Sequence, residues 1–354
     1  MKLNQEQPQN LSKPELSTHS FSIGSAQLEM GDALSRYPHW QAPTAIISDG
    51  AYGLGLFPGD PPTHEKLVEW YEPHIAAWTK YSLPETTLWF WCNEIGWATV
   101  HPVLEKYGWK YRAFHVWDKG IGQIAGNVNS KTIRRFPVVT EVCVQYELNV
   151  TLNTSDGLKL PIQSWLRHEW LRSGLPLSKA NEASGVRNAA TRKYLTQCHL
   201  WYFPPPEMME RLSSYAMLYG KPTEYPYFSL DGITPLNAEQ WSRMRTKWNH
   251  IHGVTNVWQE PSNRGKERIK SEILKCEHSN QKPLKLLEYL ILSSTDVNDV
   301  VWEPFGGLCS VSIAALRANR RCYSAEINPN YYKIAKKRLE QEKIMELSLF
   351  SDFK

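Results

Sequence analysis

The apolar residues of this chain fall into short runs separated by amphipathic stretches. The runs are rich in β-branched and aromatic residues, as strands are, and the stretches between them have helical spacing. The strands predicted are residues 44–48, 87–91, 111–117, 141–148, 299–303 and 321–327, and the helices are residues 62–80, 99–107, 283–293, 310–318 and 330–343. Strands that alternate with helices predict an α/β fold with a doubly wound, mostly parallel sheet.

This alternation stops between about residues 156 and 252, where Pro, Trp and basic residues accumulate. Between residues 157 and 222, nine Lys or Arg stand against four Glu, a local charge of +5. A change of pattern together with local charge predicts a separately shaped insert. The chain is therefore divided into a flexible polar arm and three further segments. Their boundaries are residues 1–20, 21–150, 151–252 and 253–354.

Composition narrows the class of protein. The 354 residues are 42% apolar and 21% charged, which is typical of a soluble globular chain. The net charge of +4 permits an anionic partner without requiring one. The 42 aromatic residues, 15 of them Trp, fit either core packing or flat surfaces on which bases stack.

The cysteines and the N-terminus bear on the compartment. Six cysteines without a C-x-x-C pair suggest neither a metal site nor a disulfide framework, which favours a reducing, cytoplasmic setting. The polar N-terminus lacks the apolar core of a signal peptide, and no stretch approaches the length of a membrane span. We therefore expect a cytoplasmic protein with no membrane partner.

The clearest local signal for a ligand is a strand that ends in a Gly-Gly turn. Residues 300–307 read Val-Val-Trp-Glu-Pro-Phe-Gly-Gly, a helix follows, and the next strand ends at Glu326. A turn of this kind at the carboxyl edge of a sheet binds nucleoside cofactors, and an acid 20 residues after Gly306 can accept both ribose hydroxyls.

A rival turn occurs at residues 120–126, Gly-Ile-Gly-Gln-Ile-Ala-Gly, with Glu141 beyond it. It imitates a dinucleotide fingerprint, which would make the protein an NAD-dependent oxidoreductase. Its glycine spacing is one residue too long, however, and no apolar helix follows. We interpret it as part of a mobile basic loop.

A second group of motifs carries a family resemblance. Residues 49–52, Asp-Gly-Ala-Tyr, follow a buried strand. The chain here resembles the S-adenosylmethionine-dependent DNA amino-methyltransferases, which modify adenine N6 or cytosine N4 and carry Asp/Asn/Ser-Pro-Pro-aromatic at this place. Gly-Ala replaces Pro-Pro, a departure that bears on the geometry of the turn, because prolines stiffen it.

Other segments extend the resemblance along the chain. Asp32, in Gly-Asp-Ala-Leu, resembles the acid that approaches the cofactor adenine, and residues 278–283 are similar to the His-x-x-Gln-Lys-Pro element at its methionine end. Residues 303–307 match Asp-Pro-Phe-x-Gly with Glu for Asp, and residues 116–119 and 136–141 resemble later family segments. This order of motifs is the family's β arrangement. The cofactor-binding residues it implies are Asp32, Lys282, Pro283, Glu303, Phe305, Gly306, Gly307 and Glu326.

The resemblance implies that residues 21–150 form the catalytic half of a Rossmann-like domain, residues 253–354 the cofactor-binding half, and residues 151–252 the target-recognition region. As catalytic residues it implies Asp49, which accepts hydrogen bonds from the target amine, and Tyr52, which stacks on the extruded base. Ser48 precedes Asp49, and a shift of one residue would place a Ser at the first motif position, as is typical of cytosine enzymes. A nearby Asp-Pro-Pro at residues 60–62 lacks the aromatic residue, so we interpret Asp60 as a helix cap.

The activity implied is methylation of adenine N6 in duplex DNA, in a restriction–modification system. Cytosine N4 methylation, or a DNA-binding homologue without catalysis, remains open. The partners implied are double-stranded DNA and a cognate restriction endonuclease, and a homodimer is allowed. Basic and amide side chains in the mobile loop and in the insert would contact DNA. These residues are Asn127, Lys131, Arg134, Arg135, Arg187, Arg192 and Lys193.

Overall fold

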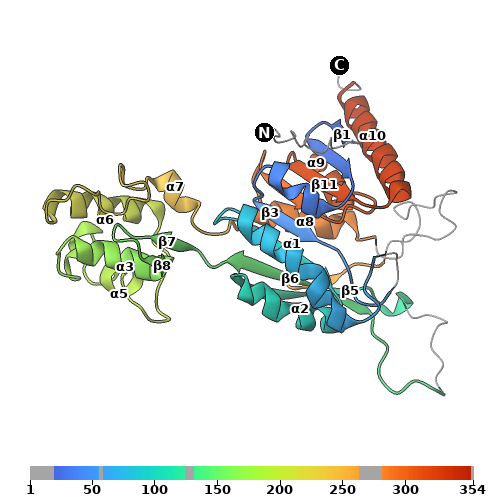
Figure 1. The fold of residues 1–354 in the computed structure, drawn as a ribbon, viewed down its shortest axis with the longest axis horizontal. Helices are drawn as coiled ribbons and strands as arrows, with labels where there is room; N and C mark the ends of the chain where they lie inside the picture. The colour runs from blue at the N-terminus through green and yellow to red at the C-terminus, as the bar shows by residue number, and fades with distance from the viewer. Residues whose placement is uncertain (1–19, 56–58, 124–130, 263–280, 352–354) are drawn as a thin grey trace, which may run out of the picture.

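The computed structural model describes residues 20–55, 59–123, 131–262 and 281–351. Most of the predicted arm, Asn127 and His278 lie outside these ranges. Nine strands form one sheet in the order β1-β2-β11-β10-β3-β4-β6-β5-β9 (Figure 1). The strands are β1 Ser20–Ile23, β2 Ala26–Met30, β3 Ala45–Ser48, β4 Thr87–Cys92, β5 Trp109–Asp118, β6 Thr140–Leu148, β9 Val257–Gln259, β10 Val300–Glu303 and β11 Arg321–Glu326.

Strands β2, β11, β10, β3 and β4 run parallel, which confirms the predicted mostly parallel sheet. β6 pairs antiparallel with β4 and β5, and β9 pairs parallel with β5 at the edge. The β1–β2 hairpin at the other edge was not predicted. Its first strand alternates exposed and half-buried residues over only four positions, too few to establish a period.

Helices cover both faces of the sheet. Along β3 and β4 successive side chains point to opposite faces, so Ile46 packs with α1 and α2 while Ile47 packs with α8 and α9. Both strands are fully buried for this reason. The helices are α1 Leu67–Tyr81, α2 Glu94–Lys106, α8 Leu284–Ser294, α9 Ser310–Arg317 and α10 Pro329–Ser351, and four short 3-10 turns are η1 Ala33–Ser35, η2 Tyr37–His39, η3 His64–Lys66 and η4 Ile121–Gln123.

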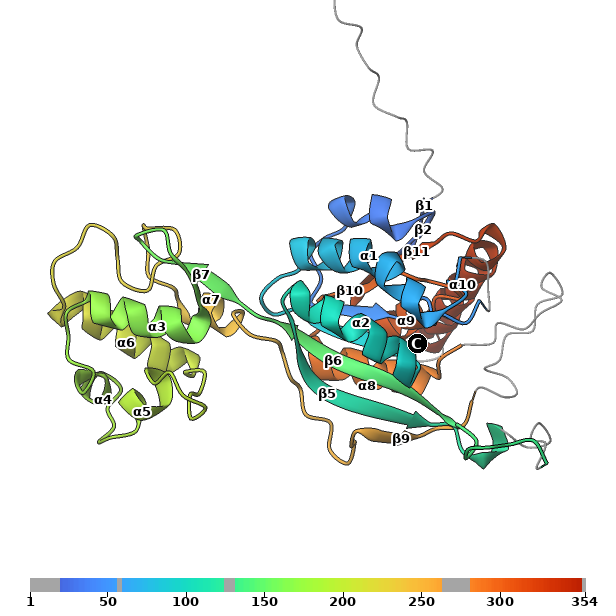
Figure 2. The same cartoon turned by 60° about the horizontal axis from the view of Figure 1, so that its bottom comes forward.

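Residues 150–244 have a core of their own, beside the sheet (Figure 2). The chain enters this insert after β6 and returns to β9 at the sheet edge. Its elements are the hairpin β7 Thr151–Asn153 and β8 Lys159–Pro161, and the helices α3 Ile162–Arg172, α4 Lys179–Ala183, α5 Ala190–Tyr194, α6 Pro206–Tyr219 and α7 Ala238–Ser242. No helix among the described residues is long and apolar enough to span a membrane.

Packing accounts for much of the aromatic content. Eight of the fifteen Trp side chains are less than 2% exposed. They are Trp78, Trp89, Trp91, Trp109, Trp165, Trp170, Trp241 and Trp302. These residues cannot serve as open stacking surfaces, so for them the packing interpretation is correct.

Candidate active site

The two turns singled out in the sequence lie side by side at one edge of the sheet. β3 and β10 are parallel neighbours, with Ala45 opposite Val301 and Ile46 opposite Trp302. Their carboxyl ends therefore point the same way, and the 49–52 turn stands next to the Gly306–Gly307 turn. An open α/β sheet holds its ligands at this edge.

Asp49 belongs to a compact cluster of charged side chains. Lys282 Nζ donates to both carboxylate oxygens of Asp49, at 2.8 and 2.9 Å, and lies 3.2 Å from Glu141 Oε2. Lys119 pairs with the other oxygen of Glu141. Two carboxylates are thus matched by two ammonium groups. Lys282 is 2% exposed, whereas the Asp49 side chain is 22% exposed and is the accessible end of the cluster.

Burial and pairing oppose each other in this cluster. Burial alone would lower the pKa of Lys282, but Asp49 and Glu141 raise it above its ordinary value. Burial alone would raise the pKa of Glu141, yet Lys282 and Lys119 bring it below its ordinary value. Lys282 and Glu141 are consequently held in their charged forms at neutral pH.

The Tyr52 hydroxyl contacts three members of the cluster. Its hydroxyl lies 3.0 Å from Asp49 Oδ1 and 3.1 Å from Glu141 Oε2, and it accepts a hydrogen bond of 3.1 Å from Lys282 Nζ. Burial, followed by the nearby Asp49 and Glu141 charges, raises the pKa of Tyr52 well above its ordinary value. The ring is only 4% exposed, whereas a stacking platform for a base needs an open face.

The turn after β3 is held without prolines. Asp60 Oδ1 accepts hydrogen bonds from the backbone N–H groups of Tyr52 and Gly53, and Asp60 Oδ2 accepts one from Leu54. Tyr71 Oη donates to the Ala51 carbonyl at 3.0 Å. Asp60 therefore clamps the residues after the turn, and the prediction that it caps a helix is wrong. The helix begins later, with Lys66 at its N-cap.

Gly50 is required by close packing. A Cβ atom there would lie 2.7 Å from two carbons of the Phe305 ring and 2.8 Å from Tyr71 Oη. Phe305 packs in turn against Trp70 and His74, with ring centroids 5.0 and 4.9 Å apart. The space that a proline would fill at position 50 is thus occupied by Phe305, a residue of the neighbouring turn.

Glu303 lies underneath the glycine turn. Its carboxylate accepts hydrogen bonds from Val311 N, Ser312 N and the hydroxyls of Ser312 and Ser324, at 2.6 to 3.0 Å. It is 3% exposed, and burial raises its pKa to about 7. Its bonds go to the start of α9 and to β11, so Glu303 fixes the turn from inside.

Glu326 and Asp32 flank the same turn. Glu326 Oε2 accepts from Gly307 N at 2.6 Å and Oε1 from Asn328 N at 2.7 Å, and burial raises its pKa to about 7. Gly306 N donates to the Ala325 carbonyl, which a Cβ at position 306 would approach to 3.0 Å. Asp32 is exposed and caps η1 by accepting from Leu34 N.

The remaining predicted residues separate into three places. Ser48 is fully buried within β3, and Pro283 is buried at the start of α8. Lys131, Arg134 and Arg135 are exposed on the connection between β5 and β6. Three further basic side chains are exposed in the insert, at or near α5. They are Arg187, Arg192 and Lys193.

Two residues of the cluster were not predicted from the sequence as site residues. Lys119 and Glu141 were placed only in motif-like segments, yet they stand at the carboxyl end of β5 and the amino end of β6. Because these antiparallel strands meet at this edge, Lys119 pairs with Glu141, and the other oxygen of Glu141 reaches Lys282. A charged residue at each end of the loop was the available signal.

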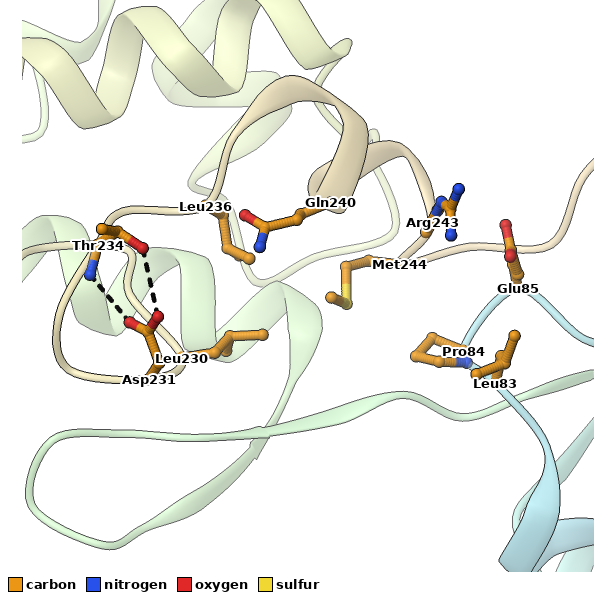
Figure 3. A pocket seen from close by; sticks show the side chains of 10 residues that line it. All are labelled: Leu83, Pro84, Glu85, Leu230, Asp231, Thr234, Leu236, Gln240, Arg243 and Met244. Atoms are coloured by element: carbon orange, nitrogen blue, oxygen red, sulfur yellow. Dashed lines mark hydrogen bonds between the residues drawn. The ribbon is translucent and has the colours of Figure 1, made fainter. Parts of the chain in front are cut away.

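A separate cavity of about 260 Å³ lies where the insert meets the sheet domain (Figure 3). Leu83 to Glu85 form one wall and residues of the insert the other. Residues 83–85 precede β4 and so belong to the amino edge of the sheet, opposite Asp49. None of the predicted site residues lines this cavity.

A doubly wound sheet with a glycine turn after one strand and a carboxylate at the end of the next defines a class of nucleoside-cofactor proteins. The sequence profile of the DNA methylase family matches residues 44–337, which is most of the chain. The chain belongs to the DNA methylase family.

Similar curated proteins match over shorter stretches. Type II methyltransferase M.HinfI of Haemophilus influenzae is 42% identical over 88 residues, 25% of this chain and 24% of its own. DNA adenine methyltransferase YhdJ of Escherichia coli is 33% identical over 94 residues, 26% of this chain and 30% of its own. The chain thus spans less than a third of the length of these two relatives. The crystal structure of an M1.HpyAVI–SAM complex overlaps 89% of this chain and 98% of its own, with a TM-score of 0.49 and 18% identity.

Proposed function

We propose that this protein transfers a methyl group from S-adenosylmethionine to the N6 amine of adenine in duplex DNA. The observation that carries the proposal is the Asp49 carboxylate, paired with Lys282 and partly open at the carboxyl edge of the sheet, beside the glycine turn of a DNA methylase. The similarity to a DNA adenine methyltransferase supports adenine. So does the burial of Ser48, which leaves Asp49 as the accessible side chain at the first motif position.

The residues around the glycine turn fit a nucleoside cofactor. Glu326 offers a carboxylate for the ribose hydroxyls, Gly306 and Gly307 keep the turn free of side chains, and the exposed Asp32 can accept from the adenine amine. Glu303, buried with internal partners, shapes the turn. When bound, S-adenosylmethionine supplies an electrophilic methyl group on a sulfonium.

The chemical task of the protein is to localise the lone pair of an exocyclic amine, which is otherwise delocalised into the ring. Asp49 accepts a hydrogen bond from the amine and fixes its orientation. Lys282 holds both oxygens of Asp49 and thereby sets the direction in which that carboxylate points. We assign Lys282 and Tyr52 to positioning Asp49, where the resemblance implied cofactor contact and base stacking.

Two groups of exposed basic residues support DNA as the substrate. One is on the connection between β5 and β6, at the active site, and the other is around α5 in the insert. Phosphate contacts by the first would hold the duplex over Asp49, and the second would read the target sequence. By its similarity to type II methyltransferases, we place the protein in a restriction–modification system, with an endonuclease of the same specificity as its partner.

The direct test incubates the full chain with methyl-labelled S-adenosylmethionine and unmethylated bacterial genomic DNA, followed by nucleoside analysis. Labelled N6-methyladenine is expected, and modification-aware sequencing of the same DNA gives the target site. Labelled N4-methylcytosine would correct the base while keeping the reaction. DNA binding without any labelled nucleoside would identify a homologue without catalysis and reject the proposal.

Replacing Lys282 by Met should lower kcat about 100-fold or more, because Asp49 and Glu141 then face each other without their shared cation. Lys282 lowers the pKa of Glu141, so its removal raises that pKa. As the pH falls, the activity that remains should therefore be lost at a higher pH than in the wild type. Lys282→Arg should recover part of the rate. The pH profile of kcat is the measurement.

Lys285→Met is the matched control for this experiment. Lys285 is on the same helix, α8, but is exposed and pairs with Glu260, outside the cluster. Its replacement should leave both rate and pH profile unchanged. A Lys282→Met protein that folds and keeps the wild-type profile would show that Lys282 does not position Asp49.

Cofactor affinity should fall as the pH drops below about 7, because Glu326 has a pKa of about 7 and ribose hydroxyls bind its ionised form. Below this pKa the Glu326 carboxyl must lose its proton before the cofactor binds. The affinity for the cofactor therefore decreases by up to about tenfold per pH unit. Titration calorimetry with S-adenosylmethionine across this range measures the effect. Glu326→Gln should bind weakly at every pH, whereas Glu303→Gln, which removes another carboxyl with a pKa of about 7, should keep the dependence.

A further inference from the structure

The connection between β5 and β6 exposes large apolar side chains. Phe136 is 94% exposed, Ile121 is 81% exposed and Val138 is 46% exposed. A lone exposed aliphatic residue is ordinary, but a nearly bare Phe on a connection that exposes two more apolar side chains indicates a surface that is covered when the protein binds its partner.

The described parts of this connection are anchored at the active site. Lys119 N donates to the Val139 carbonyl at 2.9 Å, which closes the base of the loop. The side chains of Lys119 and Glu141, at the two ends, pair with each other and join the cluster that holds Asp49. In Figure 2 the described parts of this connection lie on the side of the sheet domain away from the insert.

The charge around Phe136 matches DNA. Residues 119–139 contain two Lys and two Arg and no Asp or Glu, so this segment alone carries +4. Lys131, Arg134 and Arg135 are all exposed. An apolar side chain amid basic ones is the composition of a protein element that enters a duplex, where phosphates surround stacked bases.

Base extrusion explains why an apolar side chain is needed there. Chemistry on an adenine amine requires that the base leave the stack, at a cost of roughly a few kcal/mol, and it leaves a gap between its neighbours. Apolar wedges such as Phe fill gaps of this kind. Pro137 restricts Phe136 to an extended backbone, so the wedge is preorganised.

We propose that Phe136 enters the DNA duplex and fills the space vacated by the target base. The inference rests on the proposed function, and it adds a residue that stabilises the DNA while the target base is extruded. Neither methyl transfer nor cofactor binding requires Phe136 once the base is already unpaired.

The experiment measures kcat/KM of Phe136→Ala and of the wild type on two duplexes that contain the target site found by sequencing. In one the target base is normally paired, and in the other it faces an abasic position. On the paired duplex the variant should be about 10 to 100 times slower than the wild type. On the abasic duplex, where extrusion costs little, the two should agree within about threefold.

Val297→Ala is the matched control. Val297 is 60% exposed and precedes β10, so it lies at the amino ends of the parallel strands, whereas Asp49 lies at their carboxyl ends. Val297→Ala should therefore methylate both duplexes at the wild-type rate. Phe136→Leu should recover most of the activity, since Leu is also an apolar wedge.

Three results would overturn the inference. They are an unchanged rate of Phe136→Ala on paired DNA, an equal loss on both duplexes, and a change of oligomeric state in Phe136→Ala, which would show that a second copy covers the residue. A wild-type protein that methylates neither duplex nor genomic DNA would instead reject the proposed function itself.

Discussion

Asp49→Ala is expected to lower methyl transfer by about 1000-fold or more while S-adenosylmethionine still binds. The variant loses the acceptor that orients the target amine, and positioned acceptors of this kind contribute about 100- to 10,000-fold. The cofactor residues lie on the neighbouring turn and keep their partners, since Glu326 bonds to Gly307 and Asn328 and not to the cluster. Single-turnover methylation and calorimetric titration give the two quantities.

Two further variants define the cause of that loss. Asp49→Asn keeps the size of the side chain but only one acceptor oxygen, so its rate should lie between those of the wild type and Asp49→Ala. Asp156→Ala removes an exposed Asp of the insert and should retain its activity. Wild-type rates in a folded Asp49→Ala protein would remove Asp49 from the mechanism.

Gly50→Pro, which restores the family's residue, should inactivate the protein. The new Cβ atom would come within 2.7 Å of the Phe305 ring and 2.8 Å of Tyr71 Oη. Phe305 is confined by Trp70 and His74, so the turn must shift. Overpacking of this kind costs about 1–3 kcal/mol of stability, and a displacement of about 1 Å at Asp49 costs about 100-fold in rate.

A double variant tests whether Phe305 is the reason. Removing the ring in Gly50→Pro/Phe305→Ala should recover part of the stability that Gly50→Pro loses, which thermal unfolding of both single variants and the double variant would measure as non-additivity. Phe305→Ala has its own effect on the turn, so the comparison uses stability and not rate. Strict additivity would mean that Phe305 is not the reason, and that the backbone requirements of proline or its contact with Tyr71 Oη reject it.

Much of the sheet domain was predictable because its signals are local. β4 is a continuous apolar run, and α8 has apolar residues at helical spacing, so each was recognised from its own residues. The glycine turn and Glu326 were found for the same reason, since a strand, a turn and a helix in sequence order define the crevice.

Other features depend on contacts that local patterns do not encode. Asp60 precedes two prolines and a helix, which is the pattern of a cap, yet its carboxylate binds the backbone of residues 52–54 across a loop. Tyr52 occupies the aromatic position of a motif, but packing buries it and its hydroxyl joins the charged cluster. Neither outcome could be obtained without knowing which loops fold over which strands.

By itself, the sequence determined the α/β class, most of the alternating strands and helices of the sheet domain, the local positive charge of residues 157–222, and the motifs that place Asp49 and the glycine turn. Only the tertiary structure decided which charges meet. Lys282 is 233 residues from Asp49, and Tyr52 is 89 residues from Glu141, yet all four share one cluster. These residues meet because β3, β6 and α8 end or begin at the same edge of the sheet. The order of the strands and the packing of the helices bring distant residues together, and both are set by the burial of whole apolar surfaces.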